Sequence, residues 1–341
     1  MFRTNRATLR ILTLLAVMAG LGSAASAADP HYKRFKEIPI GGGSGWDYLS
    51  ADSIGRRLYV THGTKVVVID MDQEKVVGEI TDTPGVHGFV AVPELNRGFS
   101  SNGQENKSSI VDLQTLKTIA KVSTGPNPDS ILFEEKSGEV WTFNGRGQSA
   151  TAYDARTGRV VAASIPLGGK PETAVADADA NANRIFVNLE NKNSVAAIDI
   201  KDHKVVAEWP IAPGEGASGL AIDRALHRLI IGCGNSKMVM MDSTSGAVVG
   251  SVDCGQGVDA AAFDPETHLG FVSAGGSGTV TVARVDADRL TIVQTLTTER
   301  GARTMTVDRK THRIYLSNAK SRTDANSFKV LVYSLDETPK P

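Results

Sequence analysis

The chain has 341 residues, of which 41% are hydrophobic and 22% are charged, and its formal net charge at pH 7 is −1. This near-neutral balance lacks the basic excess with which nucleic-acid-binding proteins hold phosphates, so no nucleic-acid partner is expected. Only two cysteines are present, and a disulfide framework therefore does not build the fold.

The first 27 residues have the pattern of a secretory signal peptide. Three arginines precede an apolar run over residues 11–22, and residues 25–27 (Ala-Ser-Ala) supply the small side chains that signal peptidase recognises. We therefore predict a signal peptide over residues 1–27 and a periplasmic mature protein, with extracellular release as the alternative. The apolar run is shorter than the roughly 20 residues of a membrane helix. No membrane span is expected after cleavage; an uncleaved N-terminal anchor is the other alternative.

Seven copies of one pattern fill the rest of the chain. Each copy has a small apolar run, an acidic turn, a strand centred on a bulky residue and a second strand that usually ends in Asp. The bulky centres, 40 to 45 residues apart, are Tyr59, Phe99, Trp141, Phe186, Ile230, Phe271 and Tyr315. The acids of the turn are Asp52, Glu134, Asp179, Asp223, Asp264 and Asp308, with Val92 in the second copy. This period is typical of a four-stranded propeller blade, and β-branched runs such as residues 65–70 favour strand over helix.

The seventh copy predicts how the ring closes. It runs from about residue 302 to 336 and contains three strands, whereas residues 34–40 form an isolated strand-like segment near the mature N-terminus. Pairing this segment with the last copy leaves no open sheet edge. We therefore predict an all-β fold with a single domain over residues 28–341, a seven-bladed β-propeller with four-stranded blades whose last blade is closed by the N-terminal strand.

Two copies of the repeat carry a family resemblance. Residues 57–61 (Arg-Leu-Tyr-Val-Thr), followed by 68–70 (Val-Ile-Asp) and 75–77 (Lys-Val-Val), resemble the YVTN-repeat β-propeller family of YncE-like periplasmic proteins, and residues 313–318 repeat the motif. The resemblance covers nearly all of the mature chain and implies the propeller fold. Related propellers include binding proteins, enzyme subunits and surface proteins, so the resemblance does not select one function.

One repeat position predicts where a site lies. At the start of the innermost strand, every copy has a polar or charged residue; these are Asp47, His87, Asp129, Glu172, Ser218, Asp259 and Arg303. Innermost strands line the central channel, so these side chains should gather at one mouth. Loops after the second strands reach the same face with His62, Asn102, Asn144, Asn188, Glu190 and Asn318. Arg146 and Lys170 lie in loops nearby.

Three interpretations of this ring remain open. In the structural one, Arg303 pairs with Asp259 or Asp47 and water fills the channel. In the binding one, the mouth holds a small polar ligand or a protein partner. In the catalytic one, a divalent metal is held and assists acid–base work on an ester or lactone; its ligands would be Asp47, His87, Asp129 and Glu172.

Oxygen ligands alone would favour Ca²⁺ or Mg²⁺, and the addition of His87 and His62 favours Zn²⁺ or Mn²⁺. We predict a monomeric binding protein without turnover. A metal-assisted hydrolase or lyase and a docking subunit of a periplasmic redox system are the alternatives.

Other conspicuous residues are interpreted as structural. His227, His268 and His312 share one turn position on the opposite face, and His203 lies in another turn. No serine-hydrolase elbow and no haem-attachment motif is present in the sequence. Cys233 and Cys254 both fall in the fifth copy, on strands that are not neighbours, so their separation of roughly 9–10 Å exceeds the reach of a disulfide unless the loops lean together. A disulfide and two separate thiols are the alternatives.

Overall fold

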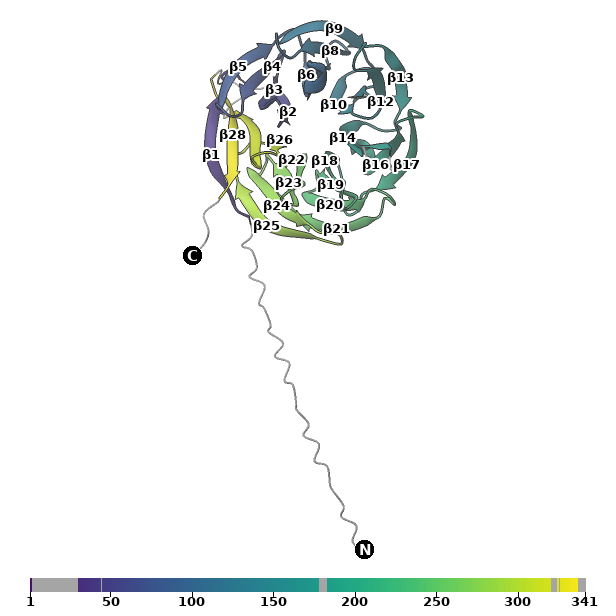
Figure 1. Ribbon diagram of the computed structural model, residues 1–341, viewed down its shortest axis with the longest axis vertical. Coiled ribbons are helices and arrows are strands. Elements are labelled where there is room, and N and C mark those ends of the chain that lie inside the picture. Colours follow the sequence, from purple (N-terminus) through teal and green to yellow (C-terminus); the bar gives the residue numbers. More distant parts are fainter. Residues whose placement is uncertain (2–29, 44, 178–182, 320–323, 325, 337–341) are drawn as a thin grey trace. The chain divides into compact units, whose positions relative to one another are not determined.

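The computed structural model describes residues 30–43, 45–177, 183–319, 324 and 326–336, together with Met1. Seven four-stranded antiparallel sheets surround a central axis (Figure 1). The predicted all-β, seven-bladed architecture is confirmed, while the predicted signal peptide over residues 1–27 lies outside the described residues apart from Met1. No helix among the described residues is long and apolar enough to span a membrane.

Blades 1 to 6 follow one another along the chain. Blade 1 comprises β2 (Trp46–Asp52), β3 (Arg57–His62), β4 (Lys65–Asp70) and β5 (Lys75–Ile80). Blade 2 comprises β6 (Val86–Val92), β7 (Arg97–Asn102), β8 (Lys107–Asp112) and β9 (Lys117–Ser123), with the short 3-10 helix η1 (Pro93–Leu95). Blade 3 comprises β10 (Pro128–Glu134), β11 (Glu139–Asn144), β12 (Ser149–Asp154) and β13 (Val160–Pro166).

The second half of the ring repeats this order. Blade 4 comprises β14 (Pro171–Asp177), β15 (Arg184–Leu189), β16 (Ser194–Asp199) and β17 (Lys204–Pro210), with η2 (Glu190–Lys192). Blade 5 comprises β18 (Ala217–Asp223), β19 (Arg228–Cys233), β20 (Lys237–Asp242) and β21 (Val248–Asp253). Blade 6 comprises β22 (Val258–Asp264), β23 (Leu269–Ala274), β24 (Thr279–Val285) and β25 (Leu290–Thr297). The remaining strands, all in blade 7, are β26 (Met305–Asp308), β27 (Arg313–Ala319), β28 (Phe328–Leu335) and β1 (Tyr32–Pro39).

Blade 7 joins the two ends of the chain. The N-terminal β1 pairs antiparallel with β28 from Tyr32↔Leu335 to Pro39↔Lys329, as the adjacent purple and yellow strands in Figure 1 show. Ion pairs of 2.7 Å, Lys33–Asp336 and Lys329–Glu37, lie along this seam. The predicted closure is confirmed, and the strand begins two residues earlier than the segment 34–40.

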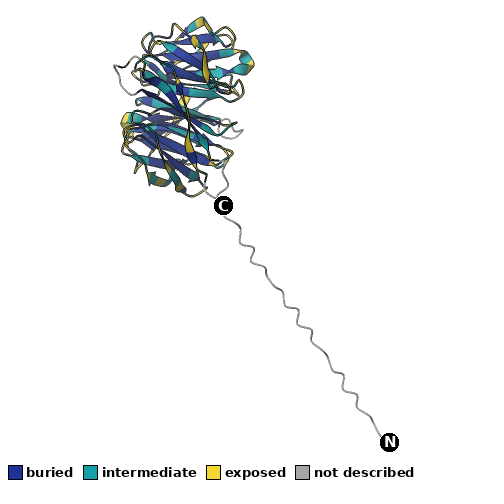
Figure 2. Cartoon of the chain, turned by 90° about the vertical axis from the view of Figure 1, so that its left-hand side faces the viewer, coloured by how far each residue is buried: buried dark blue, intermediate teal, exposed yellow. Residues whose placement is uncertain are grey.

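The core lies within and between the blades. All seven bulky repeat centres are at most 1% exposed, and aromatic rings meet across neighbouring blades, as in the Tyr59–Phe89 contact with ring centroids 4.6 Å apart. Figure 2 shows buried residues along the strands and exposed residues concentrated on loops and edges. The repeat therefore specifies both the sheet of each blade and its packing against the next blade.

The acidic residues of the repeat cap turns. Asp52 Oδ1 accepts hydrogen bonds from the backbone N–H groups of Ile54 and Gly55 at 3.1 and 2.7 Å, which is an Asx turn. In blade 4 the predicted Asp179 lies outside the described residues. Asp177 ends β14 and pairs with Arg184, as Asp52 ends β2 and pairs with Arg57 in blade 1.

The repeated histidines occupy a left-handed turn position. His227, His268 and His312 have φ of 55, 54 and 58°, at the position filled by Arg56 and Asn96 in blades 1 and 2. His312 Nδ1 also lies 2.6 Å from Oδ2 of the fully buried Asp264 of the neighbouring blade. These contacts give the turn histidines structural roles.

The two cysteines are free thiols, so the alternative of a Cys233–Cys254 disulfide is wrong for this structure. Cys233 packs in the core between blades 4 and 5, whereas Cys254 packs against the core between blades 5 and 6. Burial raises the pKa of each thiol to about 12, which makes both poor nucleophiles near neutral pH.

Candidate functional site at the axial mouth

The ring position lies in a bulge of the innermost strand in blades 1 to 6, whereas Arg303 of blade 7 precedes its innermost strand, β26. In blade 1, Trp46 pairs with His62 and Leu49 with Val60, so two residues of β2 oppose one of β3. The same register shift recurs at the ring position of blades 2 to 6. A bulge redirects side chains and frees backbone groups from the ladder. In these six blades, the position identified from the repeat is therefore the point where the bulge redirects a side chain towards the axis.

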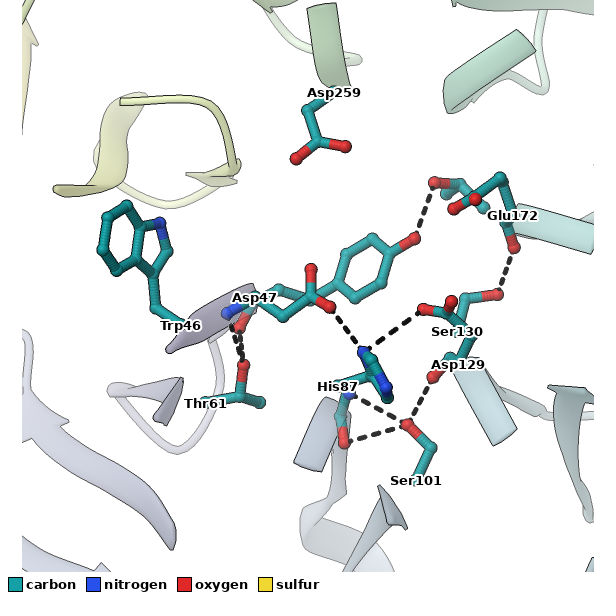
Figure 3. A network of polar contacts seen from close by, with 12 residues as sticks. Trp46, Asp47, Thr61, His87, Ser101, Asp129, Ser130, Glu172 and Asp259 are labelled. Carbon is teal, nitrogen blue, oxygen red and sulfur yellow. Dashed lines mark hydrogen bonds and ion pairs between the residues drawn. The ribbon is translucent and has the colours of Figure 1, made fainter. Parts of the chain in front are cut away.

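Polar side chains of the second strands hold these bulges. Thr61 Oγ1 accepts a hydrogen bond from the N–H of Asp47 at 3.2 Å and donates to the carbonyl oxygen of Tyr48 at 2.9 Å. Ser101 Oγ accepts from the N–H of Gly88 at 2.9 Å and donates to the carbonyl oxygen of Asp129 in the next blade. The ring backbone is thus fixed both within blades and between them, as Figure 3 shows.

Three ring residues from successive blades meet directly. His87 Nδ1 lies 2.6 Å from Asp47 Oδ2 and 3.7 Å from Asp129 Oδ1 (Figure 3). Burial lowers the pKa of His87, but the hydrogen bond with Asp47 and the charge of Asp129 outweigh it and raise this pKa above its ordinary value. An imidazolium between two carboxylates is the arrangement that these groups favour.

Three carboxyl groups at the mouth have raised pKa values. Burial raises the pKa of Asp259 although Arg303 opposes the shift, and the pKa values of Asp129 and Glu172 are raised further. Burial, with the repulsion of Asp47, raises the pKa of Asp129 to about 6 although His87 opposes the shift. Burial and the charge of Asp129 raise the pKa of Glu172 to about 8. Lys170 Nζ lies 2.6 Å from Glu172 Oε1 and favours its ionised form, yet Lys170 is 42% exposed and shared with Glu190. Burial and the charge of Asp129 therefore outweigh Lys170, and the pKa of Glu172 is raised.

On the other side of the ring, the charged side chains pair with each other. Arg303 Nη1 lies 2.9 Å from Asp259 Oδ2, and Ser218 Oγ lies 3.2 Å from Asp259 Oδ1. The pairing of Arg303 with Asp259, expected under the structural interpretation, is present. The mouth therefore has two halves: a self-paired half of Ser218, Asp259 and Arg303, and an acid-rich half defined by Asp47, His87, Asp129 and Glu172.

Sequence reasoning missed Tyr48, which closes the mouth from below. Its hydroxyl lies 3.3 Å from Thr173 Oγ1, so the side chain reaches from blade 1 to blade 4. Burial and the charges of Asp129 and Glu172 raise the pKa of Tyr48 well above its ordinary value. At this repeat position the other blades have small residues: Gly88, Ser130, Thr173, Gly219, Ala260 and Thr304. One bulky residue among six small ones was the available signal.

Tyr48 also borders the space behind the mouth. A channel of about 1040 Å³ is lined by Tyr48 and by inner-strand side chains such as Leu49, Phe89 and Met305, and none of the ring residues lines it. The acid-rich half is thus a shallow site at one end of the axis rather than part of a continuous polar pore.

The predicted outer residues divide into two groups. Asn188 Nδ2 donates to the carbonyl oxygens of Ser218 and Gly219 at 2.9 and 3.0 Å, and Glu190 pairs with Lys170. Within the described part of the chain, the side chains of the other four form no hydrogen bond or ion pair with a ring residue; these are His62, Asn102, Asn144 and Asn318. His62 stacks on Phe328 with ring centroids 4.3 Å apart, and the three amides hydrogen-bond to neighbours such as Ser109, Thr151 and Glu299.

The acid-rich half contains a candidate metal site. One ligand atom each from Asp47, His87 and Asp129 lies within 4.8 Å of the others, and among the described residues Glu172 does not belong to this group. One imidazole nitrogen with two carboxylates suits Zn²⁺ or Mn²⁺ better than Ca²⁺. The geometry fits part of the predicted set of metal ligands.

Comparison with known proteins identifies the fold alone. No protein-family model matches the chain, and no curated protein matches its sequence. Among solved structures, the chain is similar to Kuenenia stuttgartiensis hydrazine synthase, with a TM-score of 0.72 and 14% sequence identity over 84% of this chain and 95% of that chain. At this identity the likeness shows a shared β-propeller architecture, and the function has to be argued from the site.

Proposed function

We propose that the protein binds a small polar ligand at the axial mouth, in its acid-rich half, without turning the ligand over. The observation that carries this proposal is the excess of carboxyl groups over cations there. Asp47 and Asp129 share His87, and Glu172 shares Lys170 with Glu190. Asp129 and Glu172 also have raised pKa values. Such groups are characteristic of sites that bind or react.

The self-paired half of the ring provides an internal comparison. There, Asp259 and Arg303 satisfy each other, as a purely structural ring would require. In the acid-rich half, burial of like charges is unfavourable, and a ligand that donates hydrogen bonds or brings positive charge would relieve it. Tyr48 supports the proposal because it gives the site a floor.

Thermal melting with four probes tests this function: the neutral polyol glucitol, the anion gluconate, the cation glucosamine, and Zn²⁺ alone. A ligand of the folded protein raises its melting temperature. We expect at least one of the three organic probes to stabilise the wild type, and Asp129→Asn and His87→Gln to abolish the effect; a response to Zn²⁺ alone would favour a metal site instead. Asp202→Asn, in an exposed turn of blade 4, is the matched control and should retain it. No stabilisation by any probe, or full stabilisation of both site variants, would contradict the proposal.

A second candidate is metal-assisted hydrolysis or elimination, favoured by the proximity of Asp47, His87 and Asp129. These residues would hold the ion, which when bound would polarise an ester or lactone carbonyl or acidify a water molecule. Glu172, with a pKa near 8, would hold or accept a proton beside it. Stoichiometric metal in the purified protein, lost in Asp47→Asn, would support this candidate. This candidate would be excluded if the purified protein is metal-free and its melting temperature does not change with Zn²⁺, Mn²⁺ or Ca²⁺.

The N-terminal pattern and the repeat motif support a periplasmic location and a kinship with YncE-like propellers. The mature protein from a periplasmic fraction should begin at Ala28. An unprocessed chain found in the cytoplasm would contradict export. Docking to a periplasmic redox partner at the same mouth is tested by co-purification from the native host.

A further inference from the structure

A pocket of about 530 Å³ opens beside the axial mouth, between blades 3 and 4. Its polar lining consists of Asn127, Asp129, Arg146, Gln148, Lys170 and Asn191. Asp129 belongs to both this pocket and the acid-rich half of the mouth. The volume falls within the range of about 300–1,000 Å³ that is usual for small-molecule sites.

Comparison among the blades shows that this lining departs from the repeat. Two residues before the ring position, five blades have glycine, at positions 45, 85, 216, 257 and 301, whereas blades 3 and 4 have Asn127 and Lys170. The backbone is nevertheless shared, since this residue's carbonyl oxygen accepts a hydrogen bond from the loop after the second strand in blades 1 to 6. In blade 3 the bond runs from the N–H of Gly145 to Asn127 at 2.8 Å.

Asn127 keeps the backbone conformation that suits glycine. Its φ is 56°, close to the 62° of Gly85 and the 64° of Gly216. Asparagine tolerates this left-handed region less well than glycine does. The turn therefore does not require the side chain, which instead lines the pocket. The two blades that break the glycine pattern are adjacent and place their extra side chains in the same cavity.

The charges of the pocket leave one cation free. Lys170 is paired with Glu172 at 2.6 Å and with Glu190 at 2.5 Å. The side chain of Arg146 forms no hydrogen bond or ion pair with any residue in the described part of the chain. A guanidinium presents paired donors that match a carboxylate. Since the neighbouring carboxyl groups would repel a dianion, the free charge suits a monoanion.

The amides of the pocket suit hydroxyl groups. The side chains of Asn127 and Gln148 make no hydrogen bonds within the described residues, and Asn191 uses only its Oδ1, which accepts from the N–H of Lys170 at 2.7 Å. Amides both donate and accept hydrogen bonds, as hydroxyl groups do. Asp129, between pocket and mouth, can accept a hydrogen bond from a further hydroxyl.

We propose that this pocket selects the ligand of the axial mouth and that the ligand is a small hydroxylated monocarboxylate. Its carboxylate binds Arg146, its hydroxyl groups bind the amides of Asn127 and Asn191, and a further hydroxyl reaches Asp129. This inference rests on the proposed binding function and specifies its ligand class.

Calorimetric titration of the mature protein with D-gluconate tests the inference, with glucitol, hexanoate and inorganic phosphate as comparison ligands. Glucitol lacks the charge, hexanoate lacks the hydroxyl groups, and phosphate offers a different anion. We expect gluconate to bind more tightly than all three. Arg146→Gln should weaken its binding about tenfold or more, and Asn127→Gly, which restores the glycine of the repeat, about threefold.

Lys117→Gln on the outer strand of blade 2, where Lys117 is exposed, controls for the loss of one positive charge and should leave the affinity unchanged. Unaltered melting temperatures verify that the variants fold. The inference would be overturned by any of three results: an unchanged gluconate affinity in Arg146→Gln, tighter binding of phosphate than of gluconate, or no binding of gluconate. If gluconate binding falls in Asp47→Asn but not in Arg146→Gln, or if glucosamine binds instead, the proposed function stands and this subsite does not.

Discussion

The hydroxyl of Tyr48 in blade 1 lies 3.3 Å from Thr173 Oγ1 in blade 4, so one side chain links two blades across the axis. Its ring separates the acid-rich half of the mouth from the channel lined by Leu49, Phe89 and Met305. The ligand site therefore has a floor that only blade 1 supplies.

Tyr48→Ala should lower the free energy of unfolding by about 1–3 kcal/mol, because the half-buried ring loses its apolar contacts. Tyr48→Phe should cost less than about 1 kcal/mol, since its hydrogen bond is long and between neutral groups. Urea denaturation of both variants measures the difference. An equal decrease in the free energy of unfolding for both variants would show that the hydroxyl contact with Thr173, rather than the aromatic ring, stabilises the protein.

The pKa of His87 should depend on Asp47. Protonated His87 contributes stability that is complete below pH about 6.5 and is lost as the pH rises through its raised folded-state pKa. Asp47→Asn removes the hydrogen-bonded charge, so the pKa of His87 should fall. An NMR titration of the His87 ring, assigned with His87→Gln, measures this shift. An unchanged pKa in Asp47→Asn would mean that the two side chains are not paired.

The raised pKa of Glu172 predicts a stability that falls with increasing pH. The folded state holds this proton more tightly than the unfolded chain does. The loss of stability caused by ionisation of Glu172 is therefore absent below pH about 4 and complete above pH about 8. Glu172→Gln should therefore raise the free energy of unfolding by about 1–3 kcal/mol at pH 9 and leave it unchanged at pH 4. Denaturant titration at both values checks this, and a less stable variant at pH 9 would refute the assignment.

The closing strand should be essential for stability. Ile38 on β1 is 2% exposed and packs in the core shared by blades 7 and 1, so Ile38→Ala should cost about 2–4 kcal/mol. Val77→Ala on the outer strand of blade 1, where Val77 is 44% exposed, is the matched control and should have little effect. A similar loss in both variants would indicate that β1 does not close the ring in solution.

Most of the fold is predictable because the same local sequence pattern recurs in each blade. The period of the bulky centres predicts seven blades, and the missing fourth strand of the last copy predicts the place of β1. In blade 4 the repeat alone does not say where the extra residues of this copy lie, and it is Asp177 that pairs with Arg184 at the end of β14.

The site was predictable where it follows the repeat and was missed where it departs from it. The ring position recurs in every blade, whereas Tyr48 is informative as the exception at its position. The orientation of the His62 ring is set by its stacking on Phe328, which comes from the opposite end of the chain. The sequence around His62 therefore does not predict this orientation.

A crystal structure with whichever of the four probes most raises the melting temperature tests the central claim most directly. We expect the probe at the axial mouth, with a polar atom within about 2.6–3.2 Å of Asp47, Asp129 or Glu172. A probe bound away from these carboxyl groups, with His87 still between Asp47 and Asp129, would contradict it.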